Sequence, residues 1–192
     1  MITTGDFKKG LRLLIDRAPF ELMDYTVQTP TARGSATLVK CKIRNILTGA
    51  VLNRTFKSGE KFDEPDLQLR PVQFLYRDGA DYHFMDTQSY EQFQLSEDLL
   101  ADKIRWLNEG ATVTSLLFNG EVASIDLPQF MEFEVTETEP AVRGDTASGR
   151  VLKDARIPTG TTVRVPLYIE VGDRILVATA TAEFVKRIPT KS

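Results

Sequence analysis

The stretch ATLVKCKIRNI, residues 36–46, alternates between apolar and polar side chains through its middle part. One face would carry Val39, Cys41 and Ile43, and the other would carry Lys40, Lys42 and Arg44. Because successive side chains of a strand point to opposite sides, the pattern predicts a β-strand with one buried face. The three cations are therefore a candidate RNA-facing basic stripe on the outer face.

The sequence around this stretch predicts more short strands. We expect them at Leu11–Ile15, Phe20–Gln28 and, after the turn signal Thr48-Gly49, Val51–Lys57. Four or five short strands within about 60 residues are typical of a small barrel and leave no room for crossover helices. Residues 1–65 are expected to form this barrel, because Pro65 and the acids beside it stop a strand ladder.

The middle third, residues 66–129, predicts two hairpins and one helix. The hairpins are Val72–Tyr76 with Tyr82–Met85 around Asp78-Gly79, and Ala111–Phe118 with Glu121–Ile125 around Asn119-Gly120. Between them, Ser96 is the expected cap of a helix whose apolar side holds Leu99, Leu100, Ile104 and Leu107. Strands with one interposed helix favour an OB-type barrel.

The last third, residues 130–192, predicts strands only. The alternating runs are Gln129–Thr136, Thr162–Ile169 and Arg174–Lys186, separated by Gly160 and by Gly172-Asp173. We expect a second OB-type barrel of similar size. The whole chain is thus predicted to be all-β, with three consecutive small barrels.

Composition and charge limit the classes of protein. Apolar residues make up 42% and charged residues 27% of the 192 residues, as in an ordinary globular protein. Residues 1–65 hold 11 Lys/Arg against 7 Asp/Glu (+4), residues 66–129 hold 4 against 11 (−7), and residues 130–192 hold 9 against 9. Such asymmetry can orient a molecule on a polyanion, although an uneven solvated surface would look the same.

The expected location is the cytoplasm, without a membrane contact. No run approaches the roughly 18 apolar residues that a membrane-spanning helix needs, and the amino terminus lacks a signal-peptide pattern. The one cysteine, Cys41, cannot form an internal disulfide or a CxxC site.

Groups that do catalysis are scarce in this sequence. The one histidine, His83, lies in an apolar run, and Cys41 falls in register with core residues, so both are interpreted as structural. Glu132 and Glu134 alternate with apolar neighbours and are interpreted as a solvated strand face. Metal-ligand spacings and phosphate-binding loops are missing. We therefore expect no catalytic residue, no metal and no cofactor.

One loop carries an isolated cation. In QTPTARGS, residues 28–35, the side chains are small or polar except that of Arg33. Pro30 would stiffen one arm and Gly34 can adopt positive φ, so the loop is a candidate hairpin tip that presents Arg33. An ordinary loop that contains an arginine is the alternative reading.

At this loop the sequence resembles bacterial elongation factor P. The matching segments of the first third are residues 30–36, 39–42, 47–49 and 55–57. Those of the second and third parts are residues 74–79, 82–86, 139–140, 144–147, 159–160 and 163–166. The resemblance implies a KOW/SH3-like barrel followed by two OB barrels in an L-shaped, tRNA-like arrangement. It also implies a factor that binds the 70S ribosome and ribosomal RNA beside peptidyl-tRNA and relieves stalling at consecutive prolines, as a monomer.

The resemblance also implies roles for single residues. Arg33, with the tip residues Pro30, Thr31, Ala32 and Gly34, would reach the CCA end of the peptidyl-tRNA. Gly144, Asp145, Thr146 and Ala147 match a loop near the exit-site codon, and Arg187 matches a basic residue that contacts RNA.

Two questions stay open at this point. The sequence of the tip resembles that of the elongation factor P-like paralogue, which keeps an unmodified arginine. Residues 144–147 instead resemble the standard factor. The branch, and whether a modifying enzyme acts on Arg33, are therefore undecided. The rival hypotheses are a generic OB-fold single-strand nucleic-acid binder, for which a −7 middle barrel has the wrong sign, and a small β-barrel enzyme.

Overall fold

The computed structural model describes residues 1–29, 36–140 and 151–189. Within these ranges, strands dominate and fall into three modules that follow one another along the chain. No helix in the described part is long and apolar enough to cross a membrane. The prediction of an all-β chain with three small barrels is confirmed.

The first module is a four-stranded antiparallel sheet in the order β2-β3-β4-β5, closed by the short pair β1-β6. Its elements are β1 (Ile2–Thr3), the 3-10 turn η1 (Thr4–Asp6), β2 (Arg12–Ile15), β3 (Ala18–Gln28), β4 (Leu38–Asn45), β5 (Val51–Lys57) and β6 (Lys61–Phe62). The strand β3 begins at Ala18, earlier than predicted, because Asp16 and Arg17 alone form the turn, with φ of 51° and 64°.

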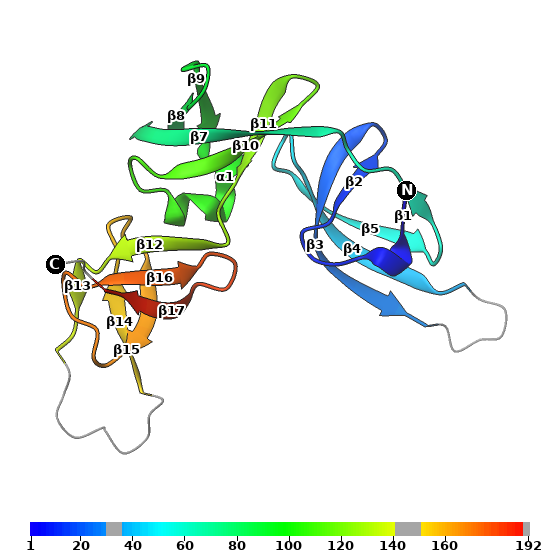
Figure 1. Cartoon of the computed structure of the whole chain (residues 1–192). Helices are drawn as coiled ribbons and strands as arrows, with labels where there is room; N and C mark the ends of the chain where they lie inside the picture. The colour runs from blue at the N-terminus through cyan, green and yellow to red at the C-terminus, as the bar shows by residue number, and fades with distance from the viewer. Residues whose placement is uncertain (30–35, 141–150, 190–192) are drawn as a thin grey trace.

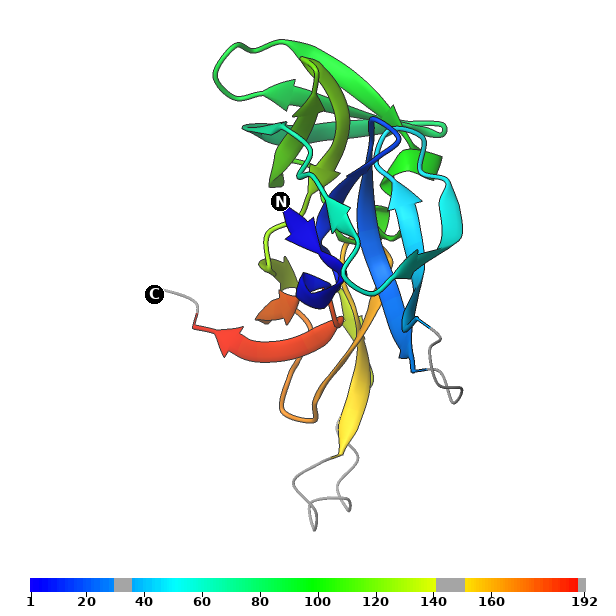
Figure 2. The same ribbon diagram turned by 90° about the vertical axis from the view of Figure 1, so that its right-hand side faces the viewer.

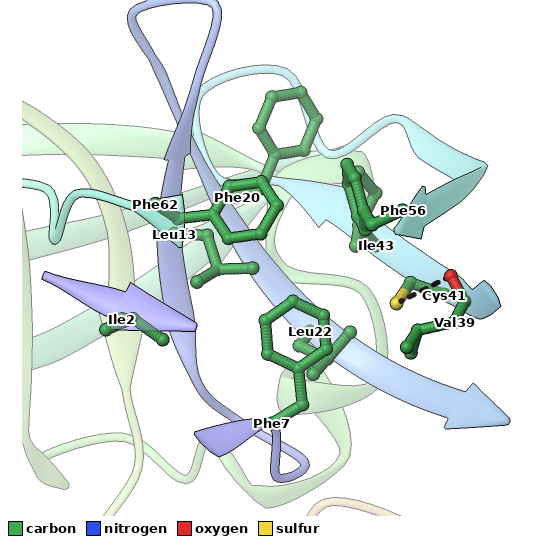
Figure 3. Packing of buried hydrophobic residues seen from close by; sticks show 10 residues of the cluster. All are labelled: Ile2, Phe7, Leu13, Phe20, Leu22, Val39, Cys41, Ile43, Phe56 and Phe62. Atoms are coloured by element: carbon green, nitrogen blue, oxygen red, sulfur yellow. Dashed lines mark hydrogen bonds between the residues drawn. The ribbon is translucent and has the colours of Figure 1, made fainter. Parts of the chain in front are cut away.

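The core of the first module forms between the two sheets, where rings from β5, β6 and the segment after η1 meet (Figure 3). Phe56 and Phe62 pack edge to face with centroids 4.8 Å apart, and Phe7 contacts both. Val39, Cys41 and Ile43 are buried on the inner face of β4, as the alternation predicted.

The second module is a five-stranded antiparallel sheet in the order β11-β10-β7-β8-β9. Its strands are β7 (Leu67–Asp78), β8 (Asp81–Asp86), β9 (Gln92–Ser96), β10 (Thr112–Phe118) and β11 (Glu121–Asp126). Both predicted hairpins are confirmed, and β9 is a strand that the sequence pattern did not indicate.

The helix predicted after Ser96 is only partly right. The helix α1 (Glu97–Leu100) has one turn, and the chain then changes to the 3-10 helix η2 (Ala101–Trp106), because Ala101 adopts φ of 47°. Ser96 is the N-cap residue but makes no side-chain capping hydrogen bond. The apolar side was predicted correctly, since Leu100 and Leu107 are buried.

The third module is a six-stranded sheet in the order β12-β16-β17-β15-β14-β13. Its strands are β12 (Phe130–Glu134), β13 (Glu137–Thr138), β14 (Leu152–Arg156), β15 (Thr162–Pro166), β16 (Arg174–Ala178) and β17 (Glu183–Ile188). The single run predicted over Arg174–Lys186 is wrong. It breaks into β16 and β17, because the chain turns at residues 179–182, where Ala182 has φ of 59° and donates its N–H to the Ala178 carbonyl.

The three modules follow a bent path with the second at the corner (Figures 1 and 2). Among the described residues, the strands of every sheet come from a single module. Side chains connect neighbouring modules at two joints, one between the first and second modules and one between the second and third. The two joints differ in chemistry.

At the joint of the first and second modules, Ile46 packs with Leu116 and Ala123 in a small apolar cluster. Arg12 forms an ion pair with Asp126, and Lys103 approaches the same carboxylate at 4.0 Å. The turn before β5 lies close to α1, since a Cβ added at Gly49 would stand 3.0 Å from the Asp98 carbonyl oxygen.

At the joint of the second and third modules, Trp106 from the end of η2 belongs to the apolar core of the third module. Its indole lies 5.8 Å from the ring of Phe133, centroid to centroid. The hydroxyls of Thr159 and Thr161 donate to the Arg105 carbonyl oxygen at 2.7 and 2.8 Å.

Candidate nucleic-acid interface

The outer face of β4 carries the cations that the sequence pattern predicted there. Lys40 and Lys42 are exposed, and each lies between a residue of β3 and a residue of β5. Lys40 is flanked by Thr26 and Thr55, and Lys42 by residues 24 and 53. Both lysines line a depression of about 470 Å³ across the three strands.

Both ammonium groups on this face are free of ion pairs with the described residues. Asp24 lies opposite Lys42 in the ladder, but its carboxylate pairs with Lys9 at 3.2 Å. The hydrogen bond from Lys9, and then the N–H of Tyr25, hold the pKa of Asp24 below its ordinary value. The carboxylate is thus charged at neutral pH and occupied, and the face stays positive at Lys40 and Lys42.

Arg44, the third predicted member of the stripe, lies apart from the two lysines. It is half-buried at the end of β4 nearest the joint, and its Nε is buried without a hydrogen-bond partner in the described part of the chain. Its charge adds to the desolvation that lowers the pKa of Lys103 in the second module. Arg44 therefore belongs to the joint between the first and second modules and not to the exposed basic face.

The two strands that border the predicted tip remain paired as far as Gln28 and Leu38. Val27 and Leu38 are 54% and 37% exposed, so this end of the ladder extends beyond the core of the module (Figure 1). Arg33 and the tip residues Pro30, Thr31, Ala32 and Gly34 lie outside the described residues. The ladder brings the neighbours of that segment to the same end of the sheet as Lys40.

In the third module, the one predicted contact residue that the structure describes is Arg187 on β17. Its guanidinium pairs with Asp173 at 2.6 Å, and its side chain is half exposed. Gly144, Asp145, Thr146 and Ala147 lie outside the described residues. Arg187 and the basic face of β4 belong to different modules.

The two residues that could do nucleophilic or acid–base chemistry, Cys41 and His83, have packing roles in the structure. Cys41 is 2% exposed, and burial raises the pKa of its thiol to about 11, so it is protonated at neutral pH. His83 is half-buried and stacked on Tyr76. In residues 1–29, 36–140 and 151–189, no group of three His, Cys, Asp or Glu side chains is arranged to hold a metal ion.

Sequence reasoning missed two features of the surface. The joint residues Arg12 and Asp126 are 114 positions apart in the chain, and no local pattern pairs residues at such a separation. The stack of Tyr76 on His83 results from a β-bulge between Phe74 and Tyr76. The aromatic residue within an alternating run was its only signal.

The fold, with its basic face, defines a modular β-barrel protein. Comparison with protein families identifies all three modules. Residues 3–62 match the elongation factor P KOW-like domain, residues 67–125 its OB domain, and residues 131–187 the elongation factor P C-terminal domain.

Relatives match over the full length. Elongation factor P of Caldanaerobacter subterraneus subsp. tengcongensis is 43% identical over 98% of this chain and 100% of its own length. Elongation factor P of Oleidesulfovibrio alaskensis is 43% identical over 97% of this chain and 100% of its own. Among solved structures, translation initiation factor 5A from Methanococcus jannaschii aligns with 65% of this chain and 92% of its own, at 22% identity and a TM-score of 0.45.

The chain belongs to the elongation factor P family. It is therefore a translation elongation factor, which the resemblance predicted.

Proposed function

We propose that this factor binds the 70S ribosome next to peptidyl-tRNA and promotes peptide-bond formation where consecutive prolines stall it. The observation that carries the proposal is the β3-β4 ladder of the first module. It extends beyond its core toward the segment that contains Arg33, and Lys40 and Lys42 on its outer face form no ion pair with any described residue. Phosphates of a tRNA or of ribosomal RNA are the ligands that such lysines suit.

In this proposal the factor positions the CCA end of the peptidyl-tRNA and does not itself catalyse the reaction. Proline is a constrained reactant, and holding the CCA end in reactive geometry removes orientational entropy from the barrier. The guanidinium of Arg33, permanently charged and fork-shaped, would hold phosphate or sugar at the CCA end. The ribosome supplies the chemistry.

The remaining predicted contacts belong to the same proposal. Gly144, Asp145, Thr146 and Ala147 would lie near the exit-site codon, and Arg187 would contact RNA with the part of its guanidinium that Asp173 leaves free. We further propose that the factor acts in the cytoplasm as a monomer with domain limits at 65/66 and 129/130. A modifying enzyme that acts on Arg33 would be a further partner.

Substitution of the tip arginine tests the proposal. Arg33→Ala should abolish the relief of polyproline stalling in a reconstituted translation assay, because the cation at the CCA end is lost. Arg17→Asn is the matched control. Arg17 is an exposed arginine in another turn of the same module, and asparagine tolerates its φ of 64°. Full activity of Arg33→Ala would refute the role of the tip, and the intact mass of protein from its native host would show whether Arg33 is modified.

A further inference from the structure

The hairpin of β7 and β8 ends in two carboxylates that lie opposite each other in the ladder. Asp78 and Asp81 are the last paired residues before the turn of Gly79 and Ala80. Among the described residues, neither carboxylate has an ion-pair partner. Like charges directly opposite each other on a sheet are destabilising. A cation bound between the two carboxylates would therefore remove an unfavourable interaction.

The next row on the same face carries two stacked rings. Tyr76 and His83 pair in the ladder, each two residues from one of the carboxylates, so all four side chains share one face. The ring centroids of Tyr76 and His83 are 4.5 Å apart and the planes differ by 17°. A β-bulge between Phe74 and Tyr76 turns the tyrosine outward, where it is 46% exposed. We call Tyr76, Asp78, Asp81 and His83 the acidic-aromatic face.

The nearest cation in the sequence does not neutralise this face. Arg77 donates its Nε–H to the Gly79 carbonyl oxygen at 2.7 Å and pairs with Glu97 at 3.0 Å. Its guanidinium also lies over the ring of Tyr82, 5.3 Å from the centroid, and Tyr82 is buried on the opposite face of β8. Other cations are scarce in this module, because residues 66–129 hold 4 Lys/Arg against 11 Asp/Glu. The acidic-aromatic face is therefore open to a cation from another molecule.

The same side of the sheet continues beyond the acidic-aromatic face with uncharged polar side chains. Gln94 of β9 completes the row of the two rings, and Ser96 completes the row of the two carboxylates. A third row holds Gln73, Met85 and Gln92. Carboxylates thus lie at one end of the surface and amides, which both donate and accept hydrogen bonds, at the other. This extent suits a segment of polypeptide, since a small free cation would contact only the acidic end.

We propose that the acidic-aromatic face docks an arginine-bearing segment of a basic protein. The arginine would stack its guanidinium on Tyr76 and donate hydrogen bonds to Asp78 and Asp81. A guanidinium suits both contacts, because it is planar and charged, binds the face of an aromatic ring and forks onto carboxylates. The surface is separate from the basic face of β4, and the inference does not rest on the role proposed for Arg33.

The two carboxylates select among other occupants. An RNA base could stack on Tyr76, but it would leave Asp78 and Asp81 without a cation and bring phosphates toward a module of net charge −7. A divalent metal ion requires more ligands than two carboxylates. In the part of the chain that the structure describes, no third His, Cys, Asp or Glu side chain joins them to hold one. Charge complementarity therefore favours an organic cation.

The single histidine of the chain gives this proposal a direct reporter. The imidazole proton signals of His83 can be followed by NMR while the full chain is titrated with the peptide acetyl-Gly-Arg-Gly-Arg-Gly-amide. We expect a saturable shift of these signals. The same peptide with citrulline in place of arginine keeps the planar group but loses its charge, and it should bind about tenfold more weakly.

Variants of the face separate its two contacts. The double variant Asp78→Asn/Asp81→Asn should weaken binding of the arginine peptide about tenfold, and Tyr76→Leu about threefold. Tyr76→Phe should bind as the unchanged protein does, because the ring remains. The matched control is Glu109→Gln/Glu121→Gln, which removes the same charge from exposed positions of the same module and should leave binding nearly unchanged. If Tyr76→Leu fails to fold, the asparagine variant tests the proposal alone.

Four results would overturn the proposal. Equal binding of the citrulline peptide, or an equal loss in the asparagine variant and its control, would mean that no specific cation contact exists. A His83 shift with spermidine at the concentration at which the arginine peptide acts would indicate a free polyamine. A shift with an RNA hairpin that carries one bulged adenosine, but not with the arginine peptide, would indicate a nucleobase.

Discussion

The two joints of the molecule hold neighbouring modules together with different chemistry. At the second joint, Trp106 is 2% exposed within the core of the third module, and hydroxyls of that module donate to a backbone carbonyl. At the first joint, the apolar cluster around Ile46 is small, and the ion pair of Arg12 and Asp126 borders it. The second joint is formed mainly by a buried aromatic ring, and the first combines a small apolar cluster with charged side chains.

This difference indicates which of the two arrangements of neighbouring modules depends on the salt concentration. Burial of apolar area is non-directional and does not depend on screening. Partly exposed ion pairs are screened by salt and lose strength with it. We therefore expect the arrangement of the second and third modules to be constant, and that of the first and second to depend on ionic strength.

The largest expected effect breaks the apolar joint. Trp106→Ala removes a large buried side chain and should lower the free energy of unfolding by about 3–5 kcal/mol. Urea unfolding measures it, with Tyr168→Ala as the exposed aromatic control, which should change little. A loss below about 1 kcal/mol would mean that the joint does not depend on this ring.

The next effect breaks the charged joint. Asp126→Asn leaves Arg12 and Lys103, which are 25% and 21% exposed, without their carboxylate, and should cost about 1–2 kcal/mol. Glu132→Gln is the control, because its partner Arg174 and its own side chain are both about half exposed. Small-angle scattering at low and high salt should show the wild-type shape approach that of Asp126→Asn as salt rises. A salt-independent wild-type shape would contradict the comparison.

A smaller effect probes the close contact of the first joint. Gly49 and Gly59 have φ of 73° and 83°, so alanine is strained at both. Only at Gly49 would the new Cβ meet another module, 3.0 Å from the Asp98 carbonyl oxygen, whereas at Gly59 nothing lies within 4 Å. Gly49→Ala should therefore cost about 1 kcal/mol more than Gly59→Ala in thermal unfolding. Equal costs would show that the turn moves away freely.

The smallest effect concerns pH. Burial lowers the pKa of Lys103 below its ordinary 10.5, Glu21 and Asp126 oppose the shift, and Arg12 and Arg44 add to it. Between the folded pKa and 10.5, the unfolded chain binds the proton more tightly, so stability should rise with pH in that window. Lys103→Met should lack this rise when urea unfolding is followed as the pH increases toward 10.5. Parallel profiles of the two proteins would contradict the assignment.

The alternation of side chains within a single strand correctly predicted which of its faces is buried and which is exposed. The alternation around Cys41 predicted a buried face and an exposed basic face, and both are confirmed for Val39, Lys40 and Lys42. The position of Arg44 at a joint could not be predicted, because it depends on a second module that the local pattern does not contain.

Backbone irregularities explain two other differences. Ala101 ends an α-helix that side-chain periodicity would continue, and residues 179–182 interrupt a run that alternates throughout. Neither position is a glycine or a proline, so the usual turn signals were missing. The roles proposed for Arg33 and for residues 144–147 stay predictions.

The confinement of every sheet to a single module has a consequence for synthesis. No strand of the first module waits for a partner from the second or third, so each barrel can close soon after its last residue leaves the exit tunnel. Trp106 is made before the third barrel and can serve as the surface on which that barrel condenses. We therefore expect a vectorial folding order, from the amino-terminal barrel onward, in which the charged first joint is closed only when Asp126 has emerged.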